Sequence, residues 1–429
     1  MTPGAEGLDY HATPPIGVPF RFFISASVFG ILAGGLLLMQ GGALFQSRWL
    51  PHTLAWVHLI TVGFMLSAML GALTQVLPVI AGATLPSSLT FARVMQTGLS
   101  VGAAGLAWGF SQMSPTVLRG SAYLLLVTVF VFIGLALRAL FRQPARHGTT
   151  RDLRFALLSL LLTVCLGVGG AELILGLFAG NLQNWVALHV TWSWAGWGLM
   201  LLAALSWQVV PMFQITPSYP KMICRFWVPV AFVGLFVISA AYLLGLHYWA
   251  AFLSVWWMLF PVSTTWLQFK SRRPKADKTF RAFQCAMLSF FAAWVLWLGE
   301  HWFDFDKTPL LIGILVLYGG FVGVIEGMLY KIVPFLVWLH GMNAGKKAPN
   351  MKKIWPDVDI TMHFYVHMLS LLCLLFSVGQ SEIWAHLAGV CVCIEFTLLM
   401  HSVLSAQAQY RNMMIAGEPF PSRPKSHLP

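Results

Sequence analysis

Long apolar runs follow one another along the chain, separated by short stretches that carry most of the charged residues. A helix that rises 1.5 Å per residue needs about 20 apolar residues to cross the hydrocarbon core of a bilayer. Twelve runs meet this need, at residues 21–42, 53–82, 90–110, 119–141, 154–180, 185–213, 227–246, 248–269, 281–302, 309–340, 363–379 and 384–408. The pattern predicts an all-α integral membrane protein with one transmembrane domain of about 12 helices over residues 21–408. Residues 1–20 and 409–429 are predicted to form cytoplasmic N-terminal and C-terminal segments.

The composition excludes an ordinary soluble protein. Hydrophobic residues make up 58% of the chain and charged residues 9%, and the mean hydropathy is +0.75. A soluble domain is about 45–50% apolar and about 25% charged. The sequence contains no glycine-rich phosphate loop, G-x-S-x-G motif or zinc-protease motif, so nucleotide-driven transport and hydrolysis have no support. Residues 1–20 lack the basic region and cleavage site of a signal peptide, so we expect the first helix to be retained.

Basic residues gather in three of the connecting stretches. Five arginines lie between residue 138, at the end of the fourth run, and residue 154, at the start of the fifth. Six lysines and arginines lie at residues 270–281 around the stretch after the eighth run, and four lysines follow the tenth. Because short cytoplasmic loops hold an excess of Lys and Arg, these stretches and both termini are predicted to face the cytoplasm of a bacterial-type inner (plasma) membrane. The basic residues of these cytoplasmic stretches then explain the net charge of +12. We therefore expect the lipid bilayer, and no nucleic acid, as a partner.

A short motif recurs three times and indicates an internal repeat. The stretches GALTQVLP, ALSWQVVP and GMLYKIVP end at Pro78, Pro211 and Pro334, which are 133 and 123 residues apart. Each lies at the predicted cytoplasmic end of the second, sixth or tenth span. Three similar helices at intervals of four spans predict three four-helix modules around a pseudo-threefold axis along the membrane normal. A chance match is the alternative, because the motif contains only one small residue, a few aliphatic residues and one proline.

Two histidines lie at similar depths in the repeated helices. His58 precedes Pro78 by 20 residues and His189 precedes Pro211 by 22, which places each about 30 Å from its proline along a helix. Both imidazoles are therefore predicted near the outer boundary, where each can bind a metal or haem iron if a second group faces it. The glycines below them leave room either for a flat macrocycle or for a close neighbouring helix: Gly63, Gly71, Gly196 and Gly198.

The predicted topology and the positions of His58 and His189 resemble subunit I of the haem-copper oxidases and the smaller haem- and copper-containing NnrS-type membrane proteins. The resemblance implies that His58 is a low-spin haem ligand on the second helix. It implies that His189 is a ligand of the copper site on the sixth. The expected cofactors are haem, of the b type, and copper, and the expected partner is a redox donor protein or second subunit. The function implied is electron transfer, or the binding and handling of nitric oxide or oxygen.

The chain also departs from this family pattern. An oxidase-like subunit carries two adjacent histidines on its seventh helix and His-x-His on its tenth, whereas residues 227–246 and 309–339 contain no histidine. We therefore expect no full terminal oxidase. His363 and His367 are four residues apart and share one helix face, which suits one metal or one haem edge, near the cytoplasmic boundary. Three other histidines are candidates for a second ligand opposite His58: His247, His301 and His386.

Three acidic residues, Glu172, Glu326 and Glu395, lie within predicted spans. An unpaired charge there costs at least about 3 kcal/mol, so each must be protonated, paired or hydrated. They are candidates for a proton route from the cytoplasmic side. For Glu326 the structural alternative is a local hydrogen bond to Tyr330 or Lys331. The same three acids support an alternative function, a cofactor-free proton-coupled secondary transporter or permease.

Overall fold

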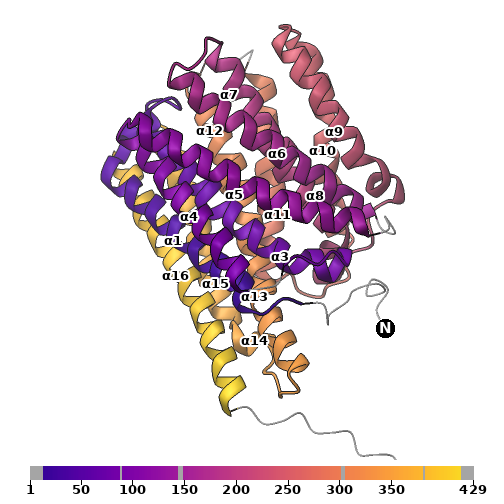
Figure 1. Cartoon of the computed structure of the whole chain (residues 1–429). Coiled ribbons are helices and arrows are strands. Elements are labelled where there is room, and N and C mark those ends of the chain that lie inside the picture. Colours follow the sequence, from indigo (N-terminus) through magenta and orange to yellow (C-terminus); the bar gives the residue numbers. More distant parts are fainter. Residues whose placement is uncertain (1–12, 87–88, 144–147, 301–304, 380–381, 417–429) are drawn as a thin grey trace, which may run out of the picture.

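The computed structural model describes residues 13–86, 89–143, 148–300, 305–379 and 382–416 (Figure 1). Within these ranges the chain forms helices and no strands. Eleven helical stretches of this part are long and apolar enough to cross a membrane: Gly17–Phe45, Pro51–Ala81, Pro115–Arg142, Gly148–Ile174, Leu182–Gln214, Lys221–Leu243, Trp249–Phe269, Lys278–Gly299, Thr308–Asn343, Asp357–Ser377 and Glu382–Ile415. The prediction of an all-α, multi-pass membrane protein is confirmed.

The remaining predicted span, residues 90–110, also forms a helix. This helix, α4 (Leu89–Ser111), packs along α5 (Pro115–Arg142), but it is not one of the eleven candidate spans of the described residues. Its sequence includes Arg93, Gln96 and several small or hydroxyl-bearing residues, which lower its hydropathy. The count of twelve spans therefore stays a prediction.

The other helices follow the predicted order with shifted ends. They are α1 (Gly17–Gln40), η1 (Gly41–Phe45), α2 (Pro51–His58), η2 (Leu59–Leu66), α3 (Ser67–Ala81), α6 (Gly148–Ile174), α7 (Leu182–Thr191), η3 (Trp192–Gly198), α8 (Leu199–Gln214), α9 (Lys221–Leu243), α10 (His247–Phe269), α11 (Lys278–Gly299), α12 (Thr308–Ile314), η4 (Leu315–Val322), α13 (Gly323–Asn343), α14 (Met351–Ile354), α15 (Asp357–Ser377) and α16 (Glu382–Ala416). The first helix begins before residue 21, and the last continues past residue 408.

Three π-helical segments support the internal repeat. These segments, η2, η3 and η4, begin at Leu59, Trp192 and Leu315. Each begins 19 residues before the proline that ends its motif. The π segments therefore recur with the same spacing as the prolines. This backbone feature is independent of the residues that make up the motif. A π turn inserts one extra residue into a helix and is frequent at functional sites, so the three helices share a backbone feature as well as a sequence motif.

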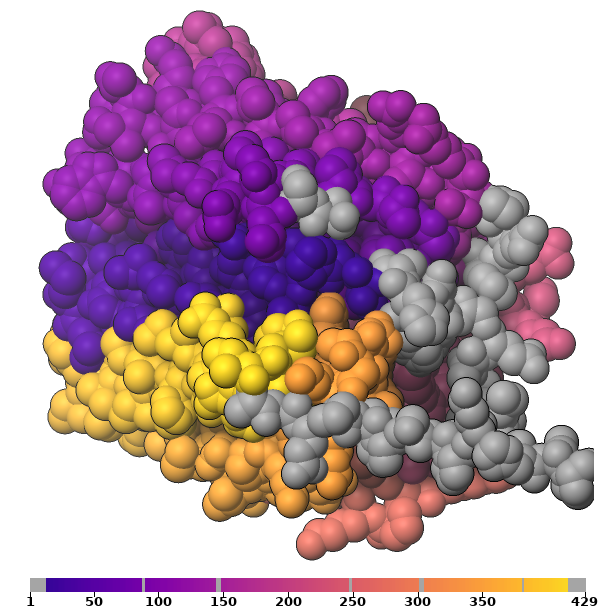
Figure 2. All heavy atoms as spheres, turned by 60° about the horizontal axis from the view of Figure 1, so that its bottom comes forward, coloured from indigo at the N-terminus to yellow at the C-terminus, as the bar shows by residue number. Residues whose placement is uncertain are grey.

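The first and last helices, α1 and α16, pack along each other, and their indigo and yellow surfaces are neighbours in Figure 2. Gly30 of α1 faces the ring of Phe396, and Gly34 faces Cys393. A Cβ atom at either glycine would overlap these side chains. Small residues allow such close helix contacts in membranes, where packing rather than the hydrophobic effect holds helices together.

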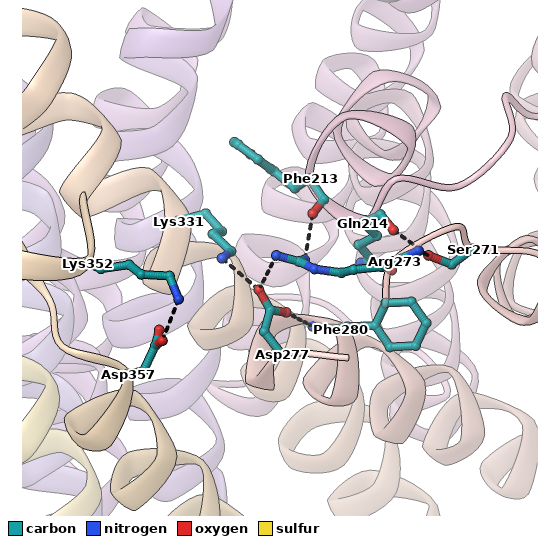
Figure 3. Close-up of polar contacts among 9 residues, drawn as sticks. All are labelled: Phe213, Gln214, Ser271, Arg273, Asp277, Phe280, Lys331, Lys352 and Asp357. Atoms are coloured by element: carbon teal, nitrogen blue, oxygen red, sulfur yellow. Dashed lines mark hydrogen bonds and ion pairs between the residues drawn. The ribbon is translucent and has the colours of Figure 1, made fainter. Parts of the chain in front are cut away.

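Asp277 joins two helices at the end of the bundle that carries the repeated prolines (Figure 3). Its side chain caps α11, because Oδ1 accepts a hydrogen bond from the Phe280 backbone N–H at 3.0 Å. Its other oxygen, Oδ2, lies 3.0 Å from Arg273 Nη2 and 2.7 Å from Lys331 Nζ. Lys331 belongs to α13, so one carboxylate stabilises the start of α11 and holds it to a repeat helix.

Replacing Asp277 by alanine is expected to lower the free energy of unfolding by about 2 kcal/mol, because the cap and two partly exposed ion pairs are lost together. Equilibrium unfolding by SDS in mixed micelles, followed by circular dichroism, measures the change. Asp357→Ala is the control, since that carboxylate pairs only with the exposed Lys352 at 2.7 Å. Equal losses in the two variants would contradict the assigned role of Asp277.

Candidate metal centre

Four buried ionisable side chains meet where α13, α15 and α16 pack together. Glu326 lies in the first turn of α13, His363 and His367 lie one turn apart on α15, and Glu395 lies within α16. All four are at most 3% exposed. The shared face predicted for the two histidines therefore points into the bundle. There it meets two of the three acids that the sequence singled out.

The distances within this cluster are those of a tight polar centre. His367 Nδ1 lies 2.9 Å from Glu395 Oε1 and 3.3 Å from Glu326 Oε2. His363 Nε2 lies 3.8 Å from Glu326 Oε1. One donor atom each from Glu326, His367 and Glu395 falls within 4.8 Å of the others. Among the described residues, this is the one group of three or more His, Cys, Asp or Glu side chains with such an arrangement.

Two tyrosines, Tyr318 and Tyr330, form hydrogen bonds with residues of the centre. Tyr318 Oη donates a hydrogen bond to Glu395 Oε2 at 2.7 Å, and the tyrosine ring stacks on His367 with centroids 5.3 Å apart. Tyr330 Oη lies 2.7 Å from His363 Nδ1. When His363 Nδ1–H donates to this oxygen, Nε2 keeps its lone pair for a metal. The sequence analysis did not assign either tyrosine to a site, although Tyr330 lies one turn after Glu326.

Within the described part of the chain, three polar atoms of the centre have no hydrogen-bond partner: both carboxylate oxygens of Glu326 and Nε2 of His363. Burying an ionised carboxylate without a partner costs far more than burying a hydrogen-bonded one. Two carboxylates in one buried site also repel each other when both are ionised. The arrangement therefore requires a bound cation or protons. The local hydrogen bond considered for Glu326 is not formed, because Tyr330 contacts His363 and Lys331 pairs with Asp277.

The helix that carries the histidine pair begins earlier than predicted. We expected the span to begin at His363, which placed the pair at the cytoplasmic boundary, but α15 begins at Asp357. His367 is consequently near the middle of its helix and is 3% exposed. His340 of α13 is not part of the centre, because its two ring nitrogens contact the backbone oxygens of Leu336 and Pro14.

His58 and His189 lie beside the first and second π segments. His58 Nδ1 is 2.7 Å from the Leu54 backbone oxygen, and His189 Nδ1 is 3.0 Å from that of Thr163. Each Nδ1–H donates to its carbonyl, which leaves Nε2 as the nitrogen with a free lone pair, as in metal-binding histidines. His58 directly precedes the first π segment and His189 lies three residues before the second, so the two histidines have similar places in the repeat.

Three of the four glycines below these histidines are packed by aromatic side chains, and the fourth, Gly196, faces Ser159 and Leu235. A Cβ atom on Gly63 would meet the Phe29 ring, and one on Gly71 would meet Phe22. Gly198 faces Phe321 in the same way. Of the two interpretations left open for these glycines, close packing of neighbouring helices is the one that the described residues show.

Glu172 does not join the two buried acids of the centre. Arg119 donates to both of its carboxylate oxygens, at 2.8–3.1 Å, between α5 and α6.

Among the candidates for a second ligand opposite His58, His386 is exposed and its Nδ1 contacts the Glu382 backbone oxygen. His301 and the side chain of His247 lie outside the described residues.

No protein-family model matches this chain, and no curated protein is similar enough to match it. The resemblance to the haem-copper oxidases and NnrS-type proteins therefore stays a prediction. The chemistry of the chain has to be argued from the donor atoms that the fold brings together.

Proposed function

We propose that the chain is a membrane metalloprotein that binds one iron ion between Glu326, His367 and Glu395. It acts in electron transfer, or in the binding and handling of a diatomic gas such as nitric oxide or oxygen, without being a full terminal oxidase. The observation that carries the proposal is the buried carboxylate of Glu326. Neither of its oxygens has a hydrogen-bond partner among the residues that the structure describes, and a second buried carboxylate and two imidazoles surround it.

The donor set suits a divalent first-row metal. Two carboxylates together cancel a charge of +2, so the occupied centre is neutral in a region where net charge is costly. Carboxylate oxygen and imidazole nitrogen together are ligands that iron, manganese and zinc accept. The proposed redox role selects iron, which would supply one-electron chemistry and could bind a diatomic gas if it were held by these residues. His363 Nε2, 3.8 Å from Glu326 Oε1, is placed to supply a further ligand.

The surrounding residues orient the donors. Tyr318 donates a hydrogen bond to Oε2 of Glu395, which leaves Oε1 of that carboxylate in contact with His367 Nδ1. The phenol of Tyr330 holds His363 through Nδ1 and fixes the ring so that Nε2 faces Glu326. Outer hydrogen bonds of this kind set the tautomer and the position of a metal ligand. Burial of all four ionisable side chains limits the access of water.

We also propose that His58 and His189 hold a second metal, copper. Imidazole nitrogen is a good copper ligand, and each ring has its Nδ1 committed to a backbone carbonyl. A single ion fits the described residues better than haem does, because Phe29 and Phe22 occupy the space beside Gly63 and Gly71. The proposed setting is a bacterial-type inner (plasma) membrane, with a redox donor protein or second subunit as the partner.

A reduced-minus-oxidised absorption spectrum with iron and copper quantification tests this function on the purified wild type, His58→Ala and Glu326→Gln. We expect Glu326→Gln to lose iron and keep copper, and His58→Ala to do the reverse. Strong haem bands that weaken in His58→Ala would instead establish the haem ligand implied by the resemblance. A colourless, metal-free wild type, expressed with ample iron, copper and haem, would contradict the redox proposal.

A second candidate function is proton-coupled transport. The observation that favours it is the row of polar side chains from Tyr330 to Tyr318, which passes through both histidines and both glutamates of the centre with neighbouring polar atoms 2.7–3.8 Å apart. Without a metal, the two carboxylates must hold protons, and such buried acids often mark proton relays. Metal-free protein in liposomes that moves protons with a solute, and stops doing so in Glu326→Gln, would support this function over the first.

A further inference from the structure

The three repeat helices surround an apolar cavity of about 170 Å³, here called the axial cavity. Its lining comes from α3, from η3 with α8, and from η4 with α13, so every repeat contributes the stretch that leads to its proline. All lining residues are apolar except two glutamines, Gln75 and Gln208. The iron site proposed above lies elsewhere in the bundle, because none of its ligands lines the axial cavity.

Gln75 is the residue that marks this cavity as a binding site. It is 6% exposed, and neither its amide nitrogen nor its amide oxygen has a hydrogen-bond partner in the described ranges of the chain. Leaving a buried amide unpaired costs about 1–3 kcal/mol for each group, so the sequence retains an unfavourable residue where leucine would pack. A ligand that both donates and accepts a hydrogen bond removes that cost. Packing alone gives no reason for an amide at this position.

No charged side chain lines the cavity, although the third motif has a lysine at the position of Gln75. The positions that correspond to Gln75 in the second and third motifs are Gln208 and Lys331. Gln208 lines the cavity as Gln75 does, whereas Lys331 pairs with Asp277 at 2.7 Å and is not a lining residue (Figure 3). Two amides and an apolar wall exclude an ion but accept a neutral molecule with one polar group.

We propose that the axial cavity binds an uncharged, ring-sized apolar molecule with one hydroxyl or carbonyl group, which hydrogen-bonds to the Gln75 amide. The size follows from the volume, since an apolar protein cavity of about 150 Å³ takes up benzene. The aromatic rings of Phe213, Phe321 and Phe335 in the lining provide flat contact surfaces for such a ring. The polar group of the ligand follows from the unpaired amide. This site is independent of the metal centre.

Phenol and toluene are matched probes for this proposal, because they have nearly the same shape and differ in the hydroxyl group. Saturable binding of each is measured by calorimetry on the full chain in lipid nanodiscs, with empty nanodiscs subtracted. We expect the wild type to bind phenol more tightly than toluene. Gln75→Leu is expected to weaken phenol binding about five- to tenfold, the value of one hydrogen bond, and to leave toluene binding unchanged.

A second variant, Ala72→Phe, fills the cavity from its wall and is expected to bind neither probe. Gln75→Leu is expected to unfold at a higher temperature than the unliganded wild type, because it removes an unpaired buried amide. The measured unfolding temperature shows that Gln75→Leu folds. Equal binding of phenol and toluene to the wild type would indicate a cavity for lipid chains and would overturn the proposal. Phenol binding that survives either substitution, or no saturable binding to the wild type, would also overturn it.

Discussion

Replacing Glu326 by glutamine is expected to weaken iron binding by at least about 100-fold, since even outer-shell substitutions cost 10- to 100-fold in metal affinity. The substitution keeps the size of the side chain but removes the negative charge. It leaves the centre with one carboxylate for a divalent ion, so the bound state carries a net positive charge inside the membrane. The affinity for Fe²⁺ is measured by competition with a chelator of known strength, in detergent and without oxygen.

Glu172→Gln is the matched control for this prediction. It neutralises another buried glutamate of the bundle, but that carboxylate lies on α6 and pairs with Arg119 of α5. We expect its iron affinity to equal that of the wild type. An equal loss in the two variants would show that general destabilisation, rather than loss of a ligand, explains the effect at Glu326. Unchanged iron affinity in Glu326→Gln would exclude this residue as a ligand.

Replacing Asp152 by alanine is expected to lower the free energy of unfolding by about 2–3 kcal/mol, the usual value of hydrogen bonds to a buried charged group whose partner stays partly exposed. Asp152 is fully buried on α6. Its Oδ1 accepts hydrogen bonds from Arg151 at 2.8 and 3.0 Å, and Oδ2 accepts one from Trp207 Nε1 of α8 at 3.0 Å. Without the carboxylate, the indole N–H loses its acceptor and Arg151 loses its counter-charge.

Equilibrium unfolding by SDS in mixed micelles measures this loss. Asp152→Asn is the matched comparison, because its amide oxygen still accepts the hydrogen bond from Trp207 while the charge is gone. We expect a smaller loss for asparagine than for alanine. An alanine variant as stable as the wild type would mean that Asp152 does not hold α6 to α8 in the membrane.

The helices could be predicted because each apolar run has the length that a bilayer imposes. The helix ends were harder, and the start of α15 shows why. Hydropathy placed it at His363, since Asp357 and Asp359 interrupt the apolar run, but Pro356 and the acidic first turn are the signals of a helix start. These signals were present in the sequence, and they place His367 near the middle of its helix rather than near its start.

The site could be predicted only in parts. The spacing of His363 and His367 predicted a shared face, and the apolar surroundings of Glu326 and Glu395 marked them as unusual acids. That these four meet depends on how α13, α15 and α16 pack, which no local pattern specifies. The glycines below His58 show the same limit. The sequence allowed either a macrocycle or a helix neighbour there, and the choice rests on phenylalanines such as Phe29 from another helix.

The most direct test of the proposed metal centre is X-ray absorption at the iron edge of the wild-type protein, purified in mild detergent with its metal content quantified. The account predicts about one iron ion per chain with only nitrogen and oxygen ligands, an outer-shell signal from imidazole, and loss of this signal in Glu326→Gln. A spectrum of porphyrin or sulfur ligation, or a wild type without iron when expressed with ample supply, would contradict it.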